Sequence, residues 1–152
     1  MRILFVCTGN TCRSPMAEAM FREKTKASAV EVRSAGVAAF DGQKASEYAR
    51  QVLDERGIPH QHAAQRLSLE LIEWSDLILT MTAGHKAFVL QSFPDVAEKV
   101  YTLKEYAGYE NEYDIADPYG GDLDIYRMSA QEIETALDKL QEKISMQIEK
   151  DS

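Results

Sequence analysis

The stretch RILFVCTGNTCRSPM, residues 2–16, joins an apolar run to a helix start through a turn of small and polar residues. The run ILFVC (3–7) predicts a buried strand. Ser14 is the expected N-cap and Pro15 the expected first residue of a helix over residues 14–27. The stretch therefore predicts a strand, a tight loop and a helix in immediate succession.

The loop CTGNTCRS (7–14) has the composition of an anion-binding turn. A loop that leads from a buried strand into a helix N-terminus can point several backbone N–H groups at one anion. We expect Gly9 to relieve crowding where the turn is tightest and Asn10 to adopt left-handed backbone angles. Arg13 can add a planar fork of donors for two oxygens of a phosphate group.

Cys7 stands at the start of this electropositive loop. Its position predicts a depressed thiol pKa and a thiolate at neutral pH, which suits nucleophilic attack on phosphorus. The spacing Cys-x5-Arg-Ser resembles the phosphate-binding motif of cysteine phosphatases, and its place between a strand and a helix strengthens that interpretation. The alternative is a buried strand-end cysteine near a solvated Arg13.

Apolar runs alternate with helical patterns along the rest of the chain. Further strands are predicted over residues 30–36, 75–81 and 99–103, and further helices over 44–57, 84–93 and the C-terminal tail. Gly57 is expected to close the helix over 44–57, and Ser129 with Glu132 has capping-box spacing at the start of the tail helix. The alternation predicts one α/β domain over residues 1–152, with a parallel sheet that helices cover on both faces. Ligands of such sheets bind at the carboxyl ends of the strands, where CTGNTCRS lies.

Composition excludes several classes of protein. The chain has 152 residues and a formal net charge of -8, which argues against nucleic acid or an anionic membrane as a partner. No apolar stretch approaches the roughly 20 residues of a membrane span, and the N-terminus has the pattern of a strand rather than of a signal peptide. Cys7 and Cys12 are the only cysteines, so we expect no disulfide framework and a cytoplasmic location.

The segment DPYGGDLDIY (117–126) supplies a second candidate catalytic group. Attack by Cys7 must expel a leaving group, which needs a proton from a positioned acid. Asp117, followed by Pro118 on a glycine-flanked loop, can serve as that acid. An ordinary Asp-Pro turn is the alternative, and only the pairing with the cysteine loop favours the catalytic role.

Three segments, CTGNTCRSPMAE (7–18), RSAG (33–36) and DPYGG (117–121), together resemble the low-molecular-weight protein tyrosine phosphatases over essentially the whole chain. The resemblance implies a four-stranded parallel sheet with helices on both faces, a Rossmann-like arrangement. It also implies a two-step reaction through a phosphocysteine intermediate, without a metal or organic cofactor. Phosphorylated proteins would be the substrates, and a protein kinase would be the functional counterpart.

The resemblance also assigns roles by position. Cys7 would be the nucleophile, and Arg13 would clamp the phosphoryl group. Asp117 would protonate the leaving group and then activate water for the second step. The remaining roles are stabilisation of the thiolate by Ser14 and bracing of the loop by Asn10, Ser14 and Ser34.

Cys12 matches a second cysteine that, in this family, can form a reversible disulfide with the nucleophile. Such a disulfide would protect Cys7 from irreversible oxidation. Simple packing of Cys12 within the loop explains its presence equally well.

Thr11 is the residue that bears on the choice of substrate. Tyrosine phosphatases of the family usually carry an aliphatic residue here, which can pack against a phenol ring, whereas Thr11 presents a hydroxyl. The loop CTGNTCRS resembles that of the bacterial protein-arginine phosphatases. Because a buried guanidinium needs hydrogen-bond partners, Thr11 and Asp117 favour phosphoarginine, with phosphotyrosine as the alternative substrate.

Other polar and aromatic residues complete the expected site. Phe40 and Tyr119 are candidates for the wall of the substrate channel. The residues expected to contact substrate are Thr8, Gly9, Asn10, Thr11, Cys12, Ser14, Phe40 and Tyr119. The three histidines, His60, His62 and His85, are expected to be solvated, and no metal site is predicted.

Two other classes of function share parts of this pattern. Thioredoxin-coupled arsenate reductases have a similar loop and fold, but their chemistry relays a disulfide through two cysteines further downstream, and this chain has none after Cys12. A catalytically inactive phosphate-binding module is expected to lose Cys7 or Asp117, and both are present. The sequence therefore favours a cysteine-dependent phosphoprotein phosphatase.

Overall fold

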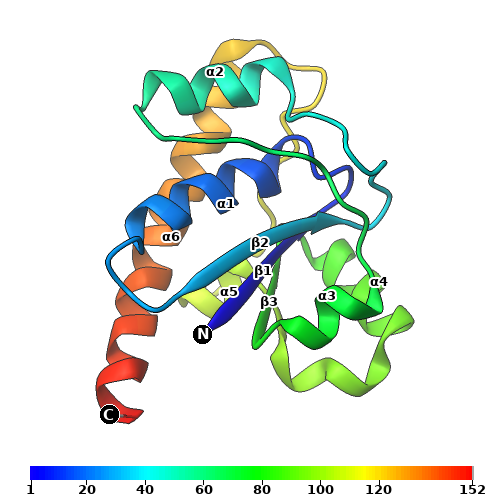
Figure 1. The fold of residues 1–152 in the computed structure, drawn as a ribbon, viewed down its shortest axis with the longest axis vertical. Coiled ribbons are helices and arrows are strands. Elements are labelled where there is room, and N and C mark those ends of the chain that lie inside the picture. The colour runs from blue at the N-terminus through cyan, green and yellow to red at the C-terminus, as the bar shows by residue number, and fades with distance from the viewer. Residues whose placement is uncertain (152) are drawn as a thin grey trace.

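A four-stranded parallel sheet forms the centre of the computed structural model, which describes residues 1–151 (Figure 1). In chain order its strands are β1 (Arg2–Cys7), β2 (Glu31–Gly36), β3 (Leu77–Thr80) and β4 (Val100–Thr102). Their order in space is β2-β1-β3-β4, and every neighbouring pair is parallel. The first strand therefore lies in the interior of the sheet.

Helices cover both faces of the sheet (Figure 1). They are α1 (Arg13–Lys24), α2 (Glu47–Glu55), α3 (Leu69–Trp74), α4 (Ala83–Ser92), the 3-10 helix η1 (Pro94–Lys99), α5 (Leu103–Ala107) and α6 (Leu123–Asp151). The helices α1, α2, α5 and α6 pack on one face, and α3 and α4 pack on the other. This arrangement confirms the predicted fold class, a single α/β domain with a four-stranded parallel sheet between two helical layers.

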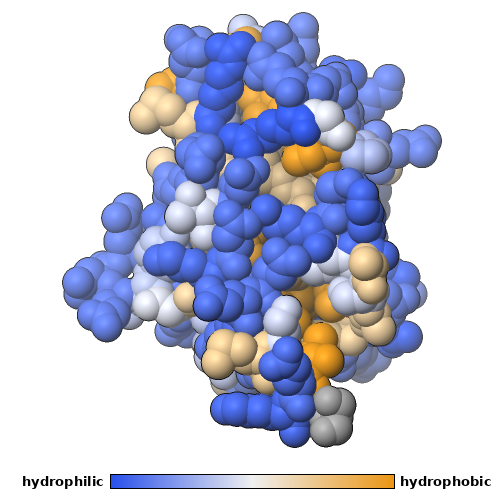
Figure 2. Space-filling view, turned by 90° about the vertical axis from the view of Figure 1, so that its left-hand side faces the viewer, coloured by the Kyte–Doolittle hydropathy of each residue, from blue (hydrophilic) through white to orange (hydrophobic). Residues whose placement is uncertain are grey.

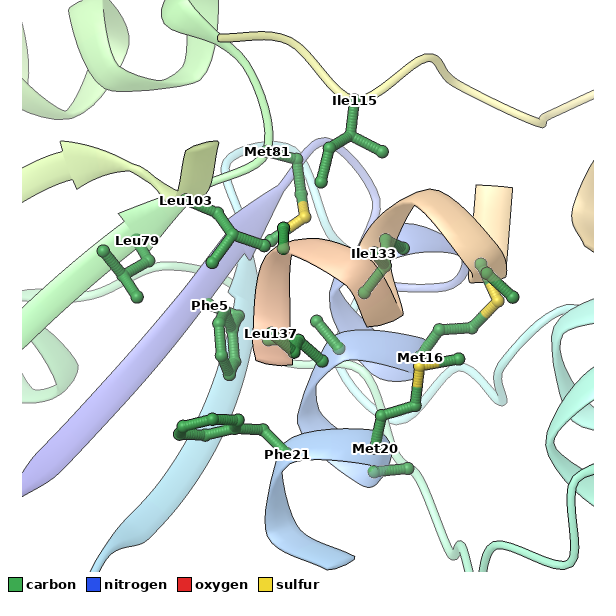
Figure 3. Close-up of a cluster of buried hydrophobic side chains, with 14 of the residues drawn as sticks. Phe5, Met16, Met20, Phe21, Leu79, Met81, Leu103, Ile115, Ile133 and Leu137 are labelled. Carbon is green, nitrogen blue, oxygen red and sulfur yellow. The ribbon is translucent and has the colours of Figure 1, made fainter. Parts of the chain in front are cut away.

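Alternate residues of β1 point into two separate apolar layers. Phe5 belongs to the layer beneath α1 and α6 (Figure 3), whereas Leu4 and Val6 belong to the layer beneath α3 and α4. The rings of Phe5 and Phe21 meet edge to face, with centroids 5.9 Å apart. Full burial of a side chain as large as Leu or Phe stabilises the fold by about 1.5–3 kcal/mol. A strand buried on both faces therefore holds its last residue, Cys7, firmly at the carboxyl edge of the sheet.

The outer surface of the layer that contains α1, α2 and α6 is mostly hydrophilic. This layer is on the left of Figure 1, and Figure 2 shows the same side with only small, scattered apolar patches. The apolar side chains of these helices are thus directed at the sheet. Within the described part of the chain, none of the helices combines the length and the apolar composition needed to cross a membrane.

The topology creates a crevice at the carboxyl end of β1. The chain runs from β1 to β2 on one side and later enters β3 on the other side of β1. At such a reversal the connecting loops diverge and leave space for a ligand. Residues 8–12, which connect β1 to α1, lie at this reversal.

Two predicted helix starts are wrong, whereas the other boundaries agree with the structure to within three residues. The helix α1 begins at Arg13 with Cys12 as its N-cap, so Ser14 and Pro15 lie two positions deeper in the helix than predicted. The Ser14 hydroxyl does not cap the helix because it is directed at Cys7 Sγ. Gly57 has a φ of 67° just beyond α2, as expected at a helix end.

The second wrong start is that of the tail helix. The helix α6 begins at Leu123, where Asp122 Oδ1 accepts a hydrogen bond of 3.0 Å from Ile125 N. Ser129, the predicted N-cap, is buried within the helix, and its hydroxyl has no hydrogen-bond partner among the described residues. The capping-box spacing of Ser129 and Glu132 therefore arises inside a continuous helix.

Candidate active site

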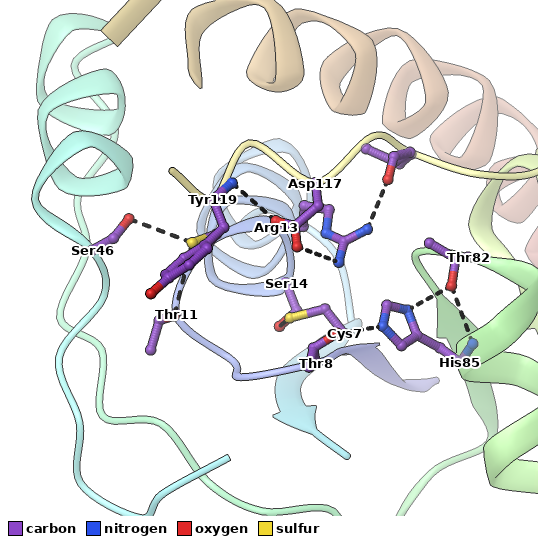
Figure 4. A network of polar contacts seen from close by, with 12 residues as sticks. Cys7, Thr8, Thr11, Arg13, Ser14, Ser46, Thr82, His85, Asp117 and Tyr119 are labelled. Atoms are coloured by element: carbon purple, nitrogen blue, oxygen red, sulfur yellow. Dashed lines mark hydrogen bonds and ion pairs between the residues drawn. The ribbon is translucent and has the colours of Figure 1, made fainter. Parts of the chain in front are cut away.

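Cys7 lies at the end of a chain of hydrogen bonds. Its Sγ is 2.8 Å from Ser14 Oγ, and Figure 4 shows these two side chains next to each other. Asn10 Nδ2 donates to the same Ser14 oxygen over 2.8 Å, which leaves the single Ser14 O–H free to donate to sulfur. Asn10 Nδ2 also donates to Ser34 Oγ over 2.9 Å, and Ser34 donates to Glu18 Oε1 over 2.6 Å. The chain of bonds thus orients a hydroxyl donor at the Cys7 sulfur.

Burial and hydrogen bonding have opposite effects on the Cys7 thiol. The residue is 3% exposed, and the loss of hydration raises the pKa of Cys7 above its ordinary value. The hydroxyl and N–H of Ser14, the charge of Arg13 and the N–H of Asn10 each lower this pKa by stabilising the thiolate. Burial is the larger effect, so the predicted depression of the Cys7 pKa is wrong.

Asn10 fixes the shape of the loop. Its φ of 57° confirms the predicted left-handed conformation. Gln65 N donates to Asn10 Oδ1 over 2.9 Å, and His62 Nε2 lies 2.7 Å from the Asn10 carbonyl oxygen. The prediction that His62 is solvated is therefore wrong, because the segment after α2 folds back against the loop. His60 is also only 17% exposed, with Nε2 2.7 Å from Asp54 Oδ1.

The closest approach to the loop occurs at Gly36, not at Gly9. A Cβ on Gly36 would lie 2.5 Å from the Thr8 carbonyl oxygen and 2.7 Å from Asn10 N. A Cβ on Gly9 would meet Thr11 Oγ1 at an ordinary 3.6 Å. The expectation for Gly9 is wrong because the crowding comes from the end of β2, which lies beside the loop in space but not in sequence.

Arg13 and Asp117 are brought together from distant parts of the chain. Arg13 is 4% exposed, and its Nη1 donates to the Ile115 carbonyl oxygen over 2.8 Å. Its Nη2 lies 3.6 Å from Asp117 Oδ2. Asp117 Oδ1 in turn accepts a hydrogen bond of 3.0 Å from Tyr119 N (Figure 4). The guanidinium thus contacts both the backbone and the carboxylate of the segment that carries the candidate acid.

These groups line a cavity of about 310 Å³. The lining residues are Cys7, Thr8, Gly9, Thr11, Cys12, Arg13, Ala38, Phe40, Gln43, Asp117 and Tyr119. Phe40 and Tyr119 are 78% and 80% exposed, which places both rings at the mouth. Asn10 and Ser14 are fully buried and are not among the lining residues, although both were expected to contact substrate.

Ala38 and Gln43 line the cavity without having been predicted. Both belong to the connection between β2 and α2, in which Phe40 was the residue singled out. Neither side chain carries a reactive or charged group that would indicate a site in the sequence. Their place in the cavity wall follows only from the path of this connection in the folded chain.

Cys12 is buried beside a cluster of hydroxyl groups. Its Sγ lies 3.3 Å from Tyr126 Oη and 3.7 Å from Ser46 Oγ. Burial, together with the contact to Cys12, raises the pKa of Tyr126 to about 12, so Tyr126 remains a neutral hydroxyl. Cys7 and Cys12 are both free thiols.

His85, near the start of α4, contacts the cysteine loop, although it was expected to be solvated. It is 8% exposed, with Nε2 2.8 Å from Thr8 Oγ1 and Nδ1 3.0 Å from Thr82 Oγ1. Burial, followed by the charge of Arg13, lowers the pKa of His85 to about 4. The prediction is wrong because the first turn of α4 faces the cysteine loop.

Nearly the whole chain matches a family of known proteins. Residues 2–150 match the family described as low molecular weight phosphotyrosine protein phosphatase. The chain belongs to this family. A protein-arginine-phosphatase of Geobacillus stearothermophilus is 48% identical over 143 residues, which are 94% of this chain and 95% of the relative. The protein-tyrosine-phosphatase PtpB of Staphylococcus haemolyticus is 39% identical over 140 residues, which are 92% of this chain and 97% of that protein.

Solved structures of the low molecular weight phosphatases share the whole fold. The YwlE arginine phosphatase from Geobacillus stearothermophilus superimposes with a TM-score of 0.93 at 46% identity, covering 96% of this chain and 94% of that chain. A structure named "YwlE arginine phosphatase - C7S mutant with phosphorylated active site serine" gives a TM-score of 0.91 at 43% identity, with 95% and 96% covered. The present protein is accordingly a cysteine-dependent phosphatase, a hydrolase that acts on phosphorylated proteins.

Proposed function

We propose that this phosphatase removes phosphoryl groups from arginine side chains of proteins. The observation that carries the proposal is the position of Thr11, whose side chain lines the same cavity as Asp117. A guanidinium group in that cavity meets a hydroxyl and a carboxylate, the partners that its N–H donors require. Relatives named protein-arginine-phosphatase, at 48% and 44% identity, support the proposal.

In the first step, Cys7 forms the covalent intermediate. After its proton has passed to solvent, the Cys7 sulfur attacks phosphorus as a thiolate, while Arg13 neutralises charge on the phosphoryl oxygens. The S–P bond forms as the P–N bond breaks, and Asp117 gives its proton to the departing nitrogen. The structure named for a phosphorylated active-site serine supports a covalent route.

In the second step, water releases the phosphoryl group. The Asp117 carboxylate takes a proton from a water molecule, whose oxygen attacks phosphorus. The S–P bond breaks with its electron pair returning to Cys7, and inorganic phosphate leaves. The Ser14 hydroxyl, 2.8 Å from the sulfur, stabilises the thiolate both as nucleophile and as leaving group. Asn10 and Ser34 support Ser14 through their hydrogen bonds.

This reaction has consequences for the partner enzyme, the cellular location and the role of Cys12. A substrate carrying phosphoarginine must be made by a protein kinase that phosphorylates arginine, which would be the counterpart of this enzyme. A catalytic thiol is best preserved in a reducing compartment, so we place the protein in the cytoplasm. Cys12 either packs against Tyr126 or forms a reversible disulfide with Cys7 under oxidation.

Phosphotyrosine is the second candidate substrate. The family description and the PtpB relative favour it. The exposed rings of Phe40 and Tyr119 at the mouth of the cavity can also stack against a phenol ring.

Matched peptides that carry either phosphoarginine or phosphotyrosine distinguish the two substrates. Phosphate release is measured as kcat/KM, with the Cys7→Ala variant as the control for release that does not use this site. We expect selectivity for phosphoarginine of about tenfold or more, equivalent to about 1.4 kcal/mol in the transition state. A preference for phosphotyrosine would overturn the proposed substrate and leave the two-step mechanism intact.

A further inference from the structure

The start of α4 holds the segment that carries Asp117. Asp114 Oδ1 accepts a hydrogen bond of 2.7 Å from Ala83 N, the first residue of α4. Ile115 N donates to the Met81 carbonyl oxygen over 2.9 Å. These two bonds lie just before the candidate acid, so the start of α4, together with Arg13, holds the acid segment in place.

The same turn of α4 contacts the cysteine loop through His85. Its Nε2 lies 2.8 Å from the hydroxyl of Thr8, the residue that follows Cys7 (Figure 4). Thr8 lines the cavity with Cys7 and Arg13. One helix turn therefore connects the loop of the nucleophile to the segment of the acid.

We propose that His85 is a positioning residue of the phosphatase reaction, which acts by holding the Thr8 hydroxyl and, through it, the cysteine loop against α4. Neither His85 nor Thr8 transfers a proton in this role. The hydrogen bond fixes where the phosphoryl group is bound relative to Asp117. A rigid connection of this kind is needed because small displacements of reacting groups cause large losses of rate.

The proposed arrangement assigns the donor and the acceptor nitrogen of the imidazole. Thr82, the N-cap of α4, accepts the His85 backbone N–H with its Oγ1 over 3.1 Å. The same Oγ1 lies 3.0 Å from His85 Nδ1, and in this arrangement the Thr82 O–H donates to Nδ1 while Nε2–H donates to Thr8. With its oxygen accepting from His85, Thr8 keeps its hydroxyl hydrogen for an oxygen of the phosphoryl group.

Burial, more than the surrounding charges, favours the neutral His85 ring that this arrangement requires. Burial and the nearby Arg13 guanidinium lower the pKa of His85 to about 4, although Asp117 and Asp114 act in the opposite direction. The imidazole therefore keeps one acceptor nitrogen for Thr82 at neutral pH.

A double-mutant cycle between His85→Phe and Thr8→Val tests the proposal. The substrate is a small aryl phosphate, and inhibition by inorganic phosphate is measured in parallel, so that the result does not depend on a preference for arginine or tyrosine. We expect each single variant to lower kcat about tenfold or more and to weaken phosphate binding. The double variant is expected to be no more than about twofold worse than the poorer single variant.

Conservative and control variants separate positioning from general stability. His85→Gln, which retains a donor close to the place of Nε2, is expected to recover at least half of the lost kcat. His60→Gln, a histidine bonded to Asp54, is expected to keep the kcat of the parent. Unchanged kcat in His85→Phe, or additive losses in the double variant, would overturn the proposal.

A measurement on the unaltered protein covers the case in which the variants fail to fold. Nitrogen-15 NMR of the His85 ring at neutral pH is expected to show the neutral Nε2–H tautomer with a protected N–H. A charged ring or the Nδ1–H tautomer would contradict the proposed hydrogen bonding.

Discussion

Ser14 Oγ lies 2.8 Å from Cys7 Sγ while it accepts a hydrogen bond from Asn10. Ser14 is fully buried, so it acts on the thiol rather than on the substrate. Ser14→Ala removes a donor that lowers the pKa of Cys7, and we therefore expect this pKa to rise further. In a plot of kcat/KM against pH, the acidic limb then moves to higher pH. The loss of rate is therefore greater at acidic than at alkaline pH. The pH dependence of Cys7 alkylation measures the shift directly.

Ser129→Ala is the matched control for this experiment. The Ser129 hydroxyl is also buried in a helix, but it has no hydrogen-bond partner among the described residues. Its removal is expected to leave the pH profile unchanged and to raise the free energy of unfolding by about 1–3 kcal/mol, because a buried hydroxyl without a partner is destabilising. An unshifted acidic limb in Ser14→Ala would show that Ser14 does not control the thiol.

Gly36→Ala is expected to open the cysteine loop. The added methyl group would lie 2.5 Å from the Thr8 carbonyl oxygen, and overpacking of this kind costs about 1–3 kcal/mol. We expect this loss in the free energy of unfolding, measured with urea, together with a fall in kcat of about tenfold or more.

Gly57→Ala controls for the effect of adding a methyl group to a glycine. Gly57 has a φ of 67° and open space around its Cα, so only backbone strain of about 1–2 kcal/mol is expected. Its kcat should equal that of the parent. If Gly36→Ala retained full kcat, the loop would not depend on this close approach.

Thr11→Ile tests the origin of substrate preference. The change replaces a hydroxyl in the cavity by an aliphatic surface that can pack against a phenol ring. We expect the ratio of kcat/KM for phosphoarginine to that for phosphotyrosine to fall about tenfold or more. Thr11→Ser retains the hydroxyl and should keep most of the ratio. If this ratio of kcat/KM values were the same in Thr11→Ile and in the parent, Thr11 would not determine the substrate preference.

Asp117→Asn is expected to reduce turnover by on the order of a hundredfold. The loss should be smaller for an aryl phosphate whose leaving group departs without a proton, because Asp117 then acts in the second step alone. Asp124→Asn, an exposed carboxylate paired with Arg127, should retain the parent rate. Equal losses in both Asp variants would argue that the effect is one of charge rather than of proton transfer.

The sequence reveals the elements whose signals are local. β1 after its first residue and the whole of β3 are buried, predominantly apolar runs, and the Cys7-x5-Arg13 spacing identifies the loop between a strand and a helix. Asn10 in the left-handed region is also predictable, because few other residues adopt it without strain. These features suffice to predict the fold class and the chemistry of the loop.

Features that depend on contacts between distant segments are not predictable in this way. His85 meets Thr8 across 77 positions, and His62 meets Asn10 across 52. The short helices α3 and α5 have six and five residues, too few for an isolated helix to be stable, so tertiary packing maintains them. The loss of hydration that raises the pKa of Cys7 likewise depends on burial by the folded chain.

The phosphoryl transfer to position 7 provides the most direct test of the account. Cys7→Ser is incubated with a peptide that carries phosphoarginine, and its phosphorylation is located by mass spectrometry, with Cys7→Ala as the control. We expect one phosphoryl group per chain, on the introduced serine, and none in Cys7→Ala. An unmodified Cys7→Ser chain that still hydrolyses the peptide would contradict covalent catalysis at Cys7.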